Sequence, residues 1–214
     1  MDQQLFFLIN SRWTAPWLDL PMAVASSWDF WWPFLLAGGI LVAIFGGFKG
    51  RAFLLVAGLA VGITDGIVVD SLKEAVGRPR PHEVFPGVRT LDLERAKPRF
   101  LALAKPIHEE YSLSRILPKG GNSFPSGHAA NNFALATVVA IFWRRLGWLS
   151  FFPAAFVSYS RIYVGSHWPL DVAVSCLIGT GIAFLVCTTA RAAWNAAGPR
   201  ICPQIHLRHP DVLA

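Results

Sequence analysis

The chain has 214 residues, of which 54% are hydrophobic and 15% are charged, and its mean hydropathy is +0.45. So few charges exclude an ordinary soluble domain, in which roughly a quarter of the residues are charged. The net charge of +6 is not concentrated in a basic run interleaved with aromatic residues, so it favours anionic lipid headgroups or a phosphate substrate over nucleic acid.

Residues 5–29 are apolar but are interrupted by charged residues and prolines, namely Arg12, Pro16, Asp19 and Pro21. This pattern predicts an amphipathic segment that lies in the membrane interface. A poor additional span is the alternative. An acidic residue near the start, with no basic region before the apolar run, does not fit a cleaved signal peptide.

Several later stretches are close to the ~20 apolar residues that a helix needs to cross a bilayer. The sequence therefore predicts an all-α fold: an integral membrane helical bundle of about five transmembrane helices, or six if the N-terminal segment also crosses. We expect one domain, in which residues 1–29 form the interfacial segment, 30–72 spans one and two, 73–125 a polar extracytoplasmic loop, 126–190 spans three to five, and 191–214 a cytoplasmic tail.

The short connections set the expected orientation. Bases with few acids lie at Lys49 and Arg51, at Arg144 and Arg145, and beyond residue 190, which is typical of cytoplasmic connections. One count opposes this orientation, because residues 73–119 hold ten lysines and arginines against seven in those connections. Several of those ten bases can have a role in the chemistry of a site, so we assign the orientation from the short connections.

The polar loop contains a stretch, residues 91–111, in which apolar and charged residues mix at roughly helical spacing. A solvated cap is one interpretation of this stretch. The other is a lid in the headgroup layer that helps to select the substrate.

Three polar clusters fall at the ends of predicted spans, on one side of the membrane. Ionisable residues at span ends are costly unless they serve a function. Lysine and arginine carry donors that suit phosphate oxygens. The clusters consist of Lys73, Arg80 and Pro81, of the turn Pro125–His128, and of Ser160, Arg161, His167 and Asp171.

In the first cluster, the bases alone would indicate only side chains that reach from a span end toward water. Beside the other two clusters, Lys73 and Arg80 are expected to bind phosphate. Arg78 either assists them or is a solvated loop residue. Asp70 precedes Lys73 by three residues, so the two can pair on one helix face.

The second cluster is a Ser-Gly turn that leads into an apolar helix. Such a turn leaves free backbone N–H groups at the positive end of the helix dipole, which is an anion site. Glycine lets an oxyanion approach the backbone closely. Ser126 and Gly127 are therefore predicted to form part of a phosphate cradle, with His128 at its rim.

In the third cluster, a histidine and an aspartate are four residues apart, a spacing that allows the carboxylate to activate the imidazole. Pro169 is a favourable first helical residue, so Asp171 falls in the first turn and can reach back toward His167. A carboxylate bonded to one ring nitrogen fixes the tautomer and leaves the other nitrogen with its lone pair. His167 is thus a candidate nucleophile, and His128 a candidate proton donor to the leaving oxygen.

Motifs for metals and for nucleotides are missing from the sequence. It has no HExxH, no carboxylate pair at metal spacing, no Cys/His cluster and no Gly-rich lysine loop. His82 and His108 could be metal ligands, but ordinary loop residues are the stronger interpretation. We therefore expect chemistry without a metal or cofactor.

Complete and in order, the three clusters resemble the signature of the type 2 phosphatidic acid phosphatase superfamily, which includes membrane lipid phosphatases and soluble vanadium haloperoxidases. The resemblance covers residues from about 30 to 190. It implies a metal-independent phosphatase with a helical core, in which His167 attacks, Asp171 orients it and His128 protonates the leaving group. It also implies a set of phosphate-binding residues, namely Lys73, Arg80, Ser126, Gly127 and Arg161.

The expected function is hydrolysis of a lipid phosphate or diphosphate monoester through a phosphohistidine. The signature recognises the phosphate and not the tail, so undecaprenyl diphosphate, phosphatidylglycerol phosphate, phosphatidic acid and lipid A phosphate are all candidates. A phosphotransferase with a lipid or sugar acceptor is one alternative, and a non-catalytic lipid-binding or transport protein is another. Resemblance to bacterial members implies an inner-membrane location with the site facing the periplasm or the outside.

Overall fold

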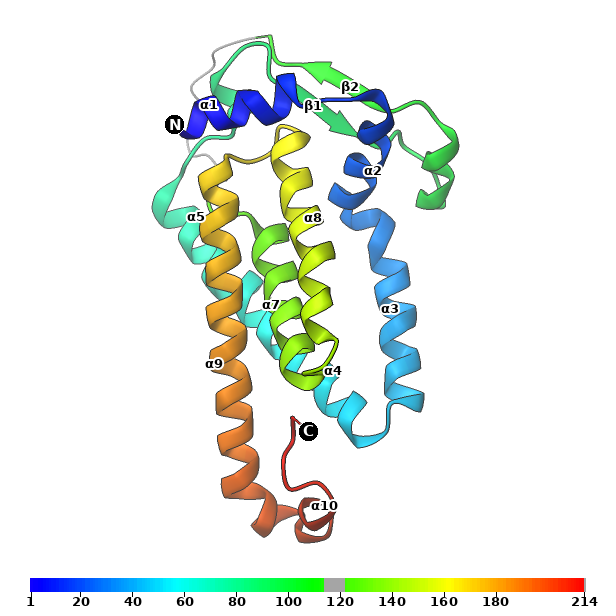
Figure 1. Ribbon diagram of the computed structural model, residues 1–214, viewed down its shortest axis with the longest axis vertical. Coiled ribbons are helices and arrows are strands. Elements are labelled where there is room, and N and C mark those ends of the chain that lie inside the picture. Colours follow the sequence, from blue (N-terminus) through cyan, green and yellow to red (C-terminus); the bar gives the residue numbers. More distant parts are fainter. Residues whose placement is uncertain (114–121, 214) are drawn as a thin grey trace.

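In the computed structural model, which describes residues 1–113 and 122–213, five helices run side by side and a cap covers one end of the bundle (Figure 1). The cap is formed by the N-terminal segment and a two-stranded ribbon. The helices of the bundle are α3 (Trp28–Phe45), α4 (Gly47–Ile63), α7 (Gly127–Phe142), α8 (Phe151–Tyr163) and α9 (Pro169–Ile201).

Shorter elements connect and cap these helices. They are α1 (Asp2–Phe7), a π-helical turn (Leu8–Arg12), α2 (Pro16–Ser26), a second π-helical turn (Thr64–Val69), α5 (Asp70–Val76), α6 (Pro81–Val84), β1 (Arg89–Asp92), a 3₁₀ helix (Arg99–Ala104), β2 (His108–Tyr111), another 3₁₀ helix (Gly147–Ser150) and α10 (Pro203–Arg208).

Three helical stretches of the described chain are long and apolar enough to cross a membrane: Trp28–Phe45, Gly47–Val84 and Pro169–Ile201. The apolar helix Gly127–Phe142 is shorter, and α8 has only 13 residues. The prediction of a mainly helical membrane bundle is confirmed. Of the five expected spans, three have the length and hydropathy of a full crossing.

Helix α3 is apolar on all sides and is scarcely covered by protein. Only 6% of its 18-residue window is buried, and side chains such as Trp31, Leu35 and Ile44 are exposed. A helix that is apolar all round and unburied in the protein is suited to hydrocarbon. We therefore assign its surface to lipid contact.

Small residues bring the central helices close together. A Cβ atom added to Gly179 of α9 would lie 2.0 Å from the carbonyl oxygen of Ala130 in α7, so the two backbones are in contact there. Ala60 of α4 and Ala134 of α7 are fully buried. Small residues allow this approach in membrane bundles, and here they bring the first turn of α7 against the third turn of α9.

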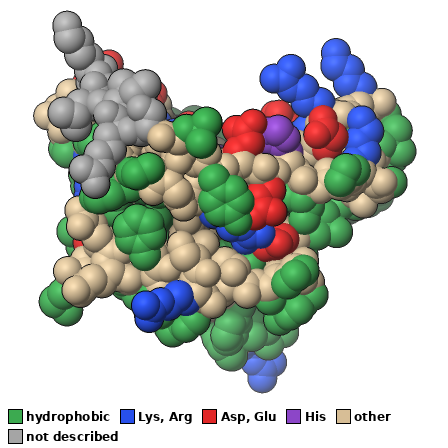
Figure 2. Space-filling view, turned by 90° about the horizontal axis from the view of Figure 1, so that it is seen from above, with side chains coloured by type: hydrophobic (Ala, Val, Ile, Leu, Met, Phe, Trp, Pro, Cys, Tyr) green, Lys and Arg blue, Asp and Glu red, His purple; other side chains and the backbone are tan. Residues whose placement is uncertain are grey.

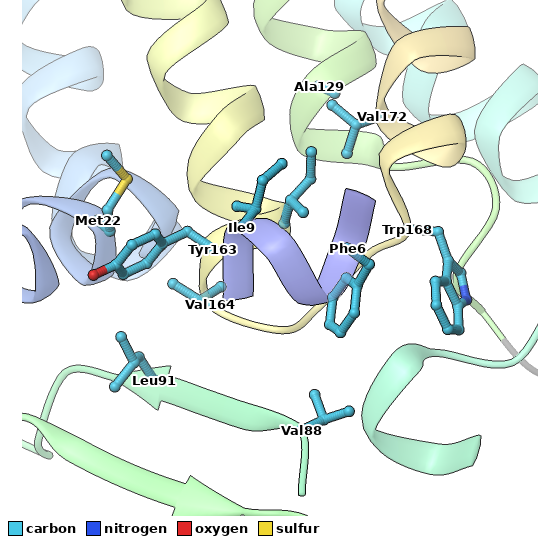
Figure 3. Close-up of a cluster of buried hydrophobic side chains, with 11 residues drawn as sticks. Phe6, Ile9, Met22, Val88, Leu91, Ala129, Tyr163, Val164, Trp168 and Val172 are labelled. Atoms are coloured by element: carbon cyan, nitrogen blue, oxygen red, sulfur yellow. The ribbon is translucent and has the colours of Figure 1, made fainter. Parts of the chain in front are cut away.

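The cap encloses an apolar cluster between α1, the ribbon and the ends of α8 and α9 (Figure 3). Phe6 of α1 lies against Trp168, with ring centroids 5.1 Å apart. Tyr163 and Val88 are also fully buried in this cluster. The N-terminal segment therefore lies across the end of the bundle, and its predicted position in the membrane interface stays a prediction.

An ion-pair network around Arg89 joins the ribbon to the N-terminal segment. The guanidinium donates to both carboxylate oxygens of Asp19, at 2.9 and 2.6 Å, and to Glu109 at 2.6 Å. Burial alone would raise the pKa of Asp19, but hydrogen bonds from Arg89 and Tyr163 lower it below its ordinary value. Asp19 is therefore ionised, and the pair fixes α2 to β1.

The stretch 91–111 forms a ribbon and a 3₁₀ helix in place of regular helical spacing. Strand β1 pairs antiparallel with β2, and Arg89 lies opposite Tyr111. Phe100, Leu101 and Leu103 are exposed on the 3₁₀ helix. Charged and hydrophobic side chains are mixed on this end of the molecule (Figure 2). Residues 114–121 of the predicted loop lie outside the described residues.

Candidate active site

All of the predicted site residues lie at the capped end of the bundle, where helices begin or end. Lys73 is in the last turn of α5, and Arg161 is in the last turn of α8. The others stand at or near helix starts: Arg80 at α6, Ser126, Gly127 and His128 at α7, and His167 and Asp171 at α9.

The connection from α8 to α9 is tied to both Arg161 and the ribbon. The backbone N–H groups of Ser166 and His167 donate to the carbonyl oxygen of Arg161, at 3.0 and 3.2 Å. Gly165 has φ +77°, and a Cβ atom there would lie 2.4 Å from the carbonyl oxygen of Arg89. Only glycine suits this position. The turn thus holds His167 next to a phosphate-binding candidate.

The imidazole of His167 is held by a backbone carbonyl. Its Nδ1 lies 2.6 Å from the carbonyl oxygen of Ser123, and the residue is 3% exposed. A carbonyl oxygen can only accept, so Nδ1 carries the proton and Nε2 keeps its lone pair. The tautomer that a nucleophile requires is therefore fixed.

The expected direct contact between Asp171 and His167 is wrong. The fully buried carboxylate of Asp171 accepts from the hydroxyl of Ser123 at 2.6 Å and from Arg78, and caps α9 through the backbone N–H of Trp168 at 3.3 Å. In the first turn of α9 this capping geometry points the carboxylate toward Ser123. Asp171 is thus connected to His167 through Ser123, whose hydroxyl it binds.

The second cluster also differs from its prediction in one contact. The backbone N–H of Ser126 donates to the hydroxyl of Ser175 at 2.8 Å, so that amide is occupied by protein. The start of α7 packs closely on the second span, since a Cβ atom on Gly127 would lie 3.2 Å from a carboxylate oxygen of Asp65. Glycine at this position keeps that approach open.

Three buried polar atoms at the site lack a hydrogen-bond partner among the described residues. They are the hydroxyl oxygen of Ser126, Nε2 of His128 and Nε of Arg161. Buried polar groups are almost always satisfied, so such atoms call for an explanation. All three can donate a hydrogen bond, and together they suit an anion with several oxygens.

The bases of the site surround the two histidines. Burial lowers the pKa of His167 well below its ordinary value, and the positive charges of Arg161 and Arg80 lower it further. His167 is therefore neutral near pH 7.

Two of the bases are held in place by neighbouring residues. Arg161 is oriented by Ser26, whose carbonyl oxygen accepts a hydrogen bond from it at 3.1 Å. Lys73 pairs with Asp70 at 3.6 Å, as its spacing predicts.

An apolar cavity of about 310 Å³ extends from this site between α3, α7 and α8. His128 lies on its wall, and the remaining lining is mostly apolar. Side chains along it include Trp28, Trp31, Leu35, Leu135, Val139 and Val157.

Two residues that contact the site residues, Ser123 and Ser26, could not be predicted from any motif in the sequence. Ser123 contributes a backbone oxygen and a hydroxyl from a turn, and Ser26 reaches Arg161 across 135 residues of sequence. Arg78 could have been ranked higher, because it lies two residues before Arg80. Its contact with Asp171 excludes the interpretation as a purely solvated loop base.

Comparison with known proteins shows the family to which the chain belongs. The profile of the PAP2 superfamily matches residues 51–195, which include every predicted site residue. The chain therefore belongs to the PAP2 superfamily, and it is an integral membrane protein of that family.

Individual relatives cover different shares of the chain. Phosphatidylglycerophosphatase B of Escherichia coli is 31% identical over 92% of this chain and 76% of its own length. The bacitracin transport permease protein BcrC of Bacillus licheniformis is 42% identical over 39% of this chain. That match spans only 45% of BcrC, less than half its length.

A solved structure supports the same fold. The crystal structure of Aquifex aeolicus LpxE superposes with a TM-score of 0.62 and 27% sequence identity, covering 87% of this chain and 94% of that one.

Proposed function

We propose that the protein is a lipid phosphatase that removes a terminal phosphate from a membrane lipid through a phosphohistidine. The observation that carries this proposal is the 2.6 Å bond from His167 to the carbonyl of Ser123, which leaves Nε2 free to attack. The buried donors on Ser126, His128 and Arg161, which have no partner within residues 1–113 and 122–213, support a phosphate beside it.

In the first step, Nε2 of His167 donates its lone pair to phosphorus, and the bond from phosphorus to the lipid oxygen breaks. His128, which takes up a proton when the phosphate anion binds beside it, gives that proton to the departing oxygen, which leaves as the lipid alcohol or as the shortened lipid phosphate. Arg80 and Arg161, with Lys73, neutralise the charge on the three equatorial oxygens. The positive charge on the phosphorylated imidazole is stabilised by the hydrogen bond from Nδ1 to the carbonyl oxygen of Ser123.

In the second step, water attacks phosphorus and the bond between phosphorus and Nε2 breaks. His128, now deprotonated, accepts a proton from the water. Inorganic phosphate leaves, and both histidines return to their starting protonation states. Every step is assigned to side chains of this chain, so no metal ion or cofactor enters the proposed reaction.

The substrate is proposed to present its phosphate at the capped end while its tail lies among the helices. Support comes from the apolar cavity that has His128 on its wall, and from the similarity to phosphatidylglycerophosphatase B of Escherichia coli. We propose phosphatidylglycerol phosphate, phosphatidic acid, undecaprenyl diphosphate and lipid A phosphate as the substrates to test.

Phosphate release from these four lipids, by purified protein in the presence of EDTA, tests the proposal. We expect at least one lipid to be hydrolysed, with activity unchanged by EDTA and inhibited by vanadate, which mimics the trigonal-bipyramidal phosphorus. In ¹⁸O-labelled water the label should enter the released phosphate. Loss of activity with EDTA would contradict the metal-free reaction. Transfer of phosphate to another lipid, without label in free phosphate, would indicate a phosphotransferase.

A further inference from the structure

The N-terminal helix reaches the machinery of the site through one side chain, Asp2. Its carboxylate accepts from Arg78 at 2.6 Å and, with its other oxygen, from the backbone N–H of Leu170 at 2.9 Å. Leu170 is next to Asp171 in the first turn of α9. Asp2 therefore bridges the segment before Arg80 and the start of α9.

Arg78 is held between two carboxylates. One nitrogen of its guanidinium donates to Asp2, and the other donates to the fully buried Asp171. The guanidinium also lies over the ring of Trp168, 5.4 Å from its centroid. Among the described residues Arg78 is the cation paired with Asp171, and a buried carboxylate without such a partner is strongly disfavoured.

The chain of contacts continues from Asp171 to the reactive imidazole. Asp171 accepts from the hydroxyl of Ser123, and the carbonyl of Ser123 accepts from Nδ1 of His167. The backbone N–H of Ser123 in turn donates to the carbonyl oxygen of Arg78 at 2.8 Å. Ser123 is thus bound by Arg78, by Asp171 and by His167, so that a shift of Arg78 would move the acceptor of the imidazole.

Packing of α1 keeps Asp2 in place. Phe6 of the same helix is fully buried against Trp168, which itself donates to the carbonyl oxygen of Pro79 at 2.9 Å. Figure 3 shows Phe6 and Trp168 next to each other. Helix α1 is therefore fastened both to the Arg78 segment and to the turn that carries His167.

We propose that Asp2 and Arg78 are positioning residues, which hold Asp171 and Ser123 so that His167 keeps its attacking tautomer and direction. The N-terminal helix would then be a required part of the site, although it lies outside residues 51–195 that match the family profile. This inference rests on the proposed function.

Kinetics of Asp2→Asn, Arg78→Gln and the double variant test the inference, with dioctanoyl phosphatidic acid as the probe. We expect kcat to fall about 10-fold for Asp2→Asn and about 100-fold for Arg78→Gln, because small misplacements of reacting groups have effects of this size. The double variant should be no slower than Arg78→Gln, since both act through one chain of contacts. KM and inhibition by vanadate should change less than about twofold, because the phosphate-binding bases are untouched.

Two further variants separate positioning from a general loss of stability. Asp2→Glu keeps the carboxylate and should retain most of kcat, and Gln4→Ala on the exposed face of the same helix should match wild type. In ¹⁵N-histidine-labelled protein, with the signal of His167 assigned by its loss in His167→Asn, wild type should show the tautomer protonated at Nδ1. Asp2→Asn should show a mixture of tautomers at an unchanged melting temperature.

Wild-type kcat and an unchanged tautomer in Asp2→Asn would overturn the inference. Parallel losses of kcat, vanadate inhibition and melting temperature in that variant would also overturn it, because they would indicate a general loss of stability. These results would leave the proposed function intact if wild type is active and His167→Ala is inactive. If wild type hydrolyses none of the lipids and binds no vanadate, the proposed function fails and the inference fails with it.

Discussion

Replacement of His167 by alanine is expected to lower the rate of phosphate release by roughly 10⁴-fold or more, the scale of loss when a nucleophile is removed. The reason is that His167 is the buried imidazole whose Nε2 is left with its lone pair by a short hydrogen bond at Nδ1. Ser123 fixes that lone pair by accepting from Nδ1 at 2.6 Å. The measurement is release of inorganic phosphate from the preferred lipid by purified protein in the same detergent or nanodisc.

The matched control is His108→Ala. His108 lies on the exposed strand β2, where it contacts Glu110 at 2.9 Å, and it takes no part in the proposed reaction. Its replacement should leave kcat unchanged. The melting temperature of His167→Ala should stay close to that of wild type, which separates lost chemistry from lost folding. A His167→Ala protein that is folded and fully active would contradict the proposed mechanism.

Replacement of His128 by alanine is expected to have the second largest effect, and that effect should depend on the leaving group. With an alkyl lipid phosphate, loss of the general acid should cost about 10²–10⁴-fold in the rate of the first step. Nε2 of His128 is buried without a hydrogen-bond partner in the part of the chain that the structure describes, and His128 lines the apolar cavity, as a donor to a lipid oxygen should. With p-nitrophenyl phosphate, whose leaving group needs no proton, the first step should be close to that of wild type.

Rapid mixing distinguishes the two steps for His128→Ala. We expect a burst of nitrophenolate followed by slow turnover, because water attack on the phosphohistidine also uses His128. Equal losses with the lipid and with p-nitrophenyl phosphate, and no burst, would show that His128 positions the phosphate and does not transfer a proton. The comparison therefore tests the role of His128 independently of its contribution to binding.

The helical part of this fold follows from sequence because each helix carries its own signals. A window as long and apolar as Trp28–Phe45 is typical of a membrane-spanning helix. Pro169 and Asp171 mark the start of α9, and Gly165 marks the turn before it, with φ +77°. The ribbon was not predicted, because two strands of four residues each carry too little periodicity to be distinguished from a charged loop.

For the site, the sequence predicts which residues gather and not how they contact one another. Arg161, His167 and Asp171 are local in sequence, and α7 and α9 are brought together by Gly179. The partner of His167 is a backbone oxygen, and any residue type could supply it. Asp2 reaches Leu170 across 168 residues of sequence, and such a contact depends on how α1 packs.

The most direct test of the central claim is to trap the phosphorylated enzyme. Protein mixed with ³²P-labelled lipid and quenched within milliseconds should carry label that is stable in base and labile in acid, as a phosphohistidine is. Peptide mapping should place that label on His167, and His128→Ala should accumulate more of it when an activated phosphate ester is used. Turnover without a labelled protein, or label on another residue, would contradict the account.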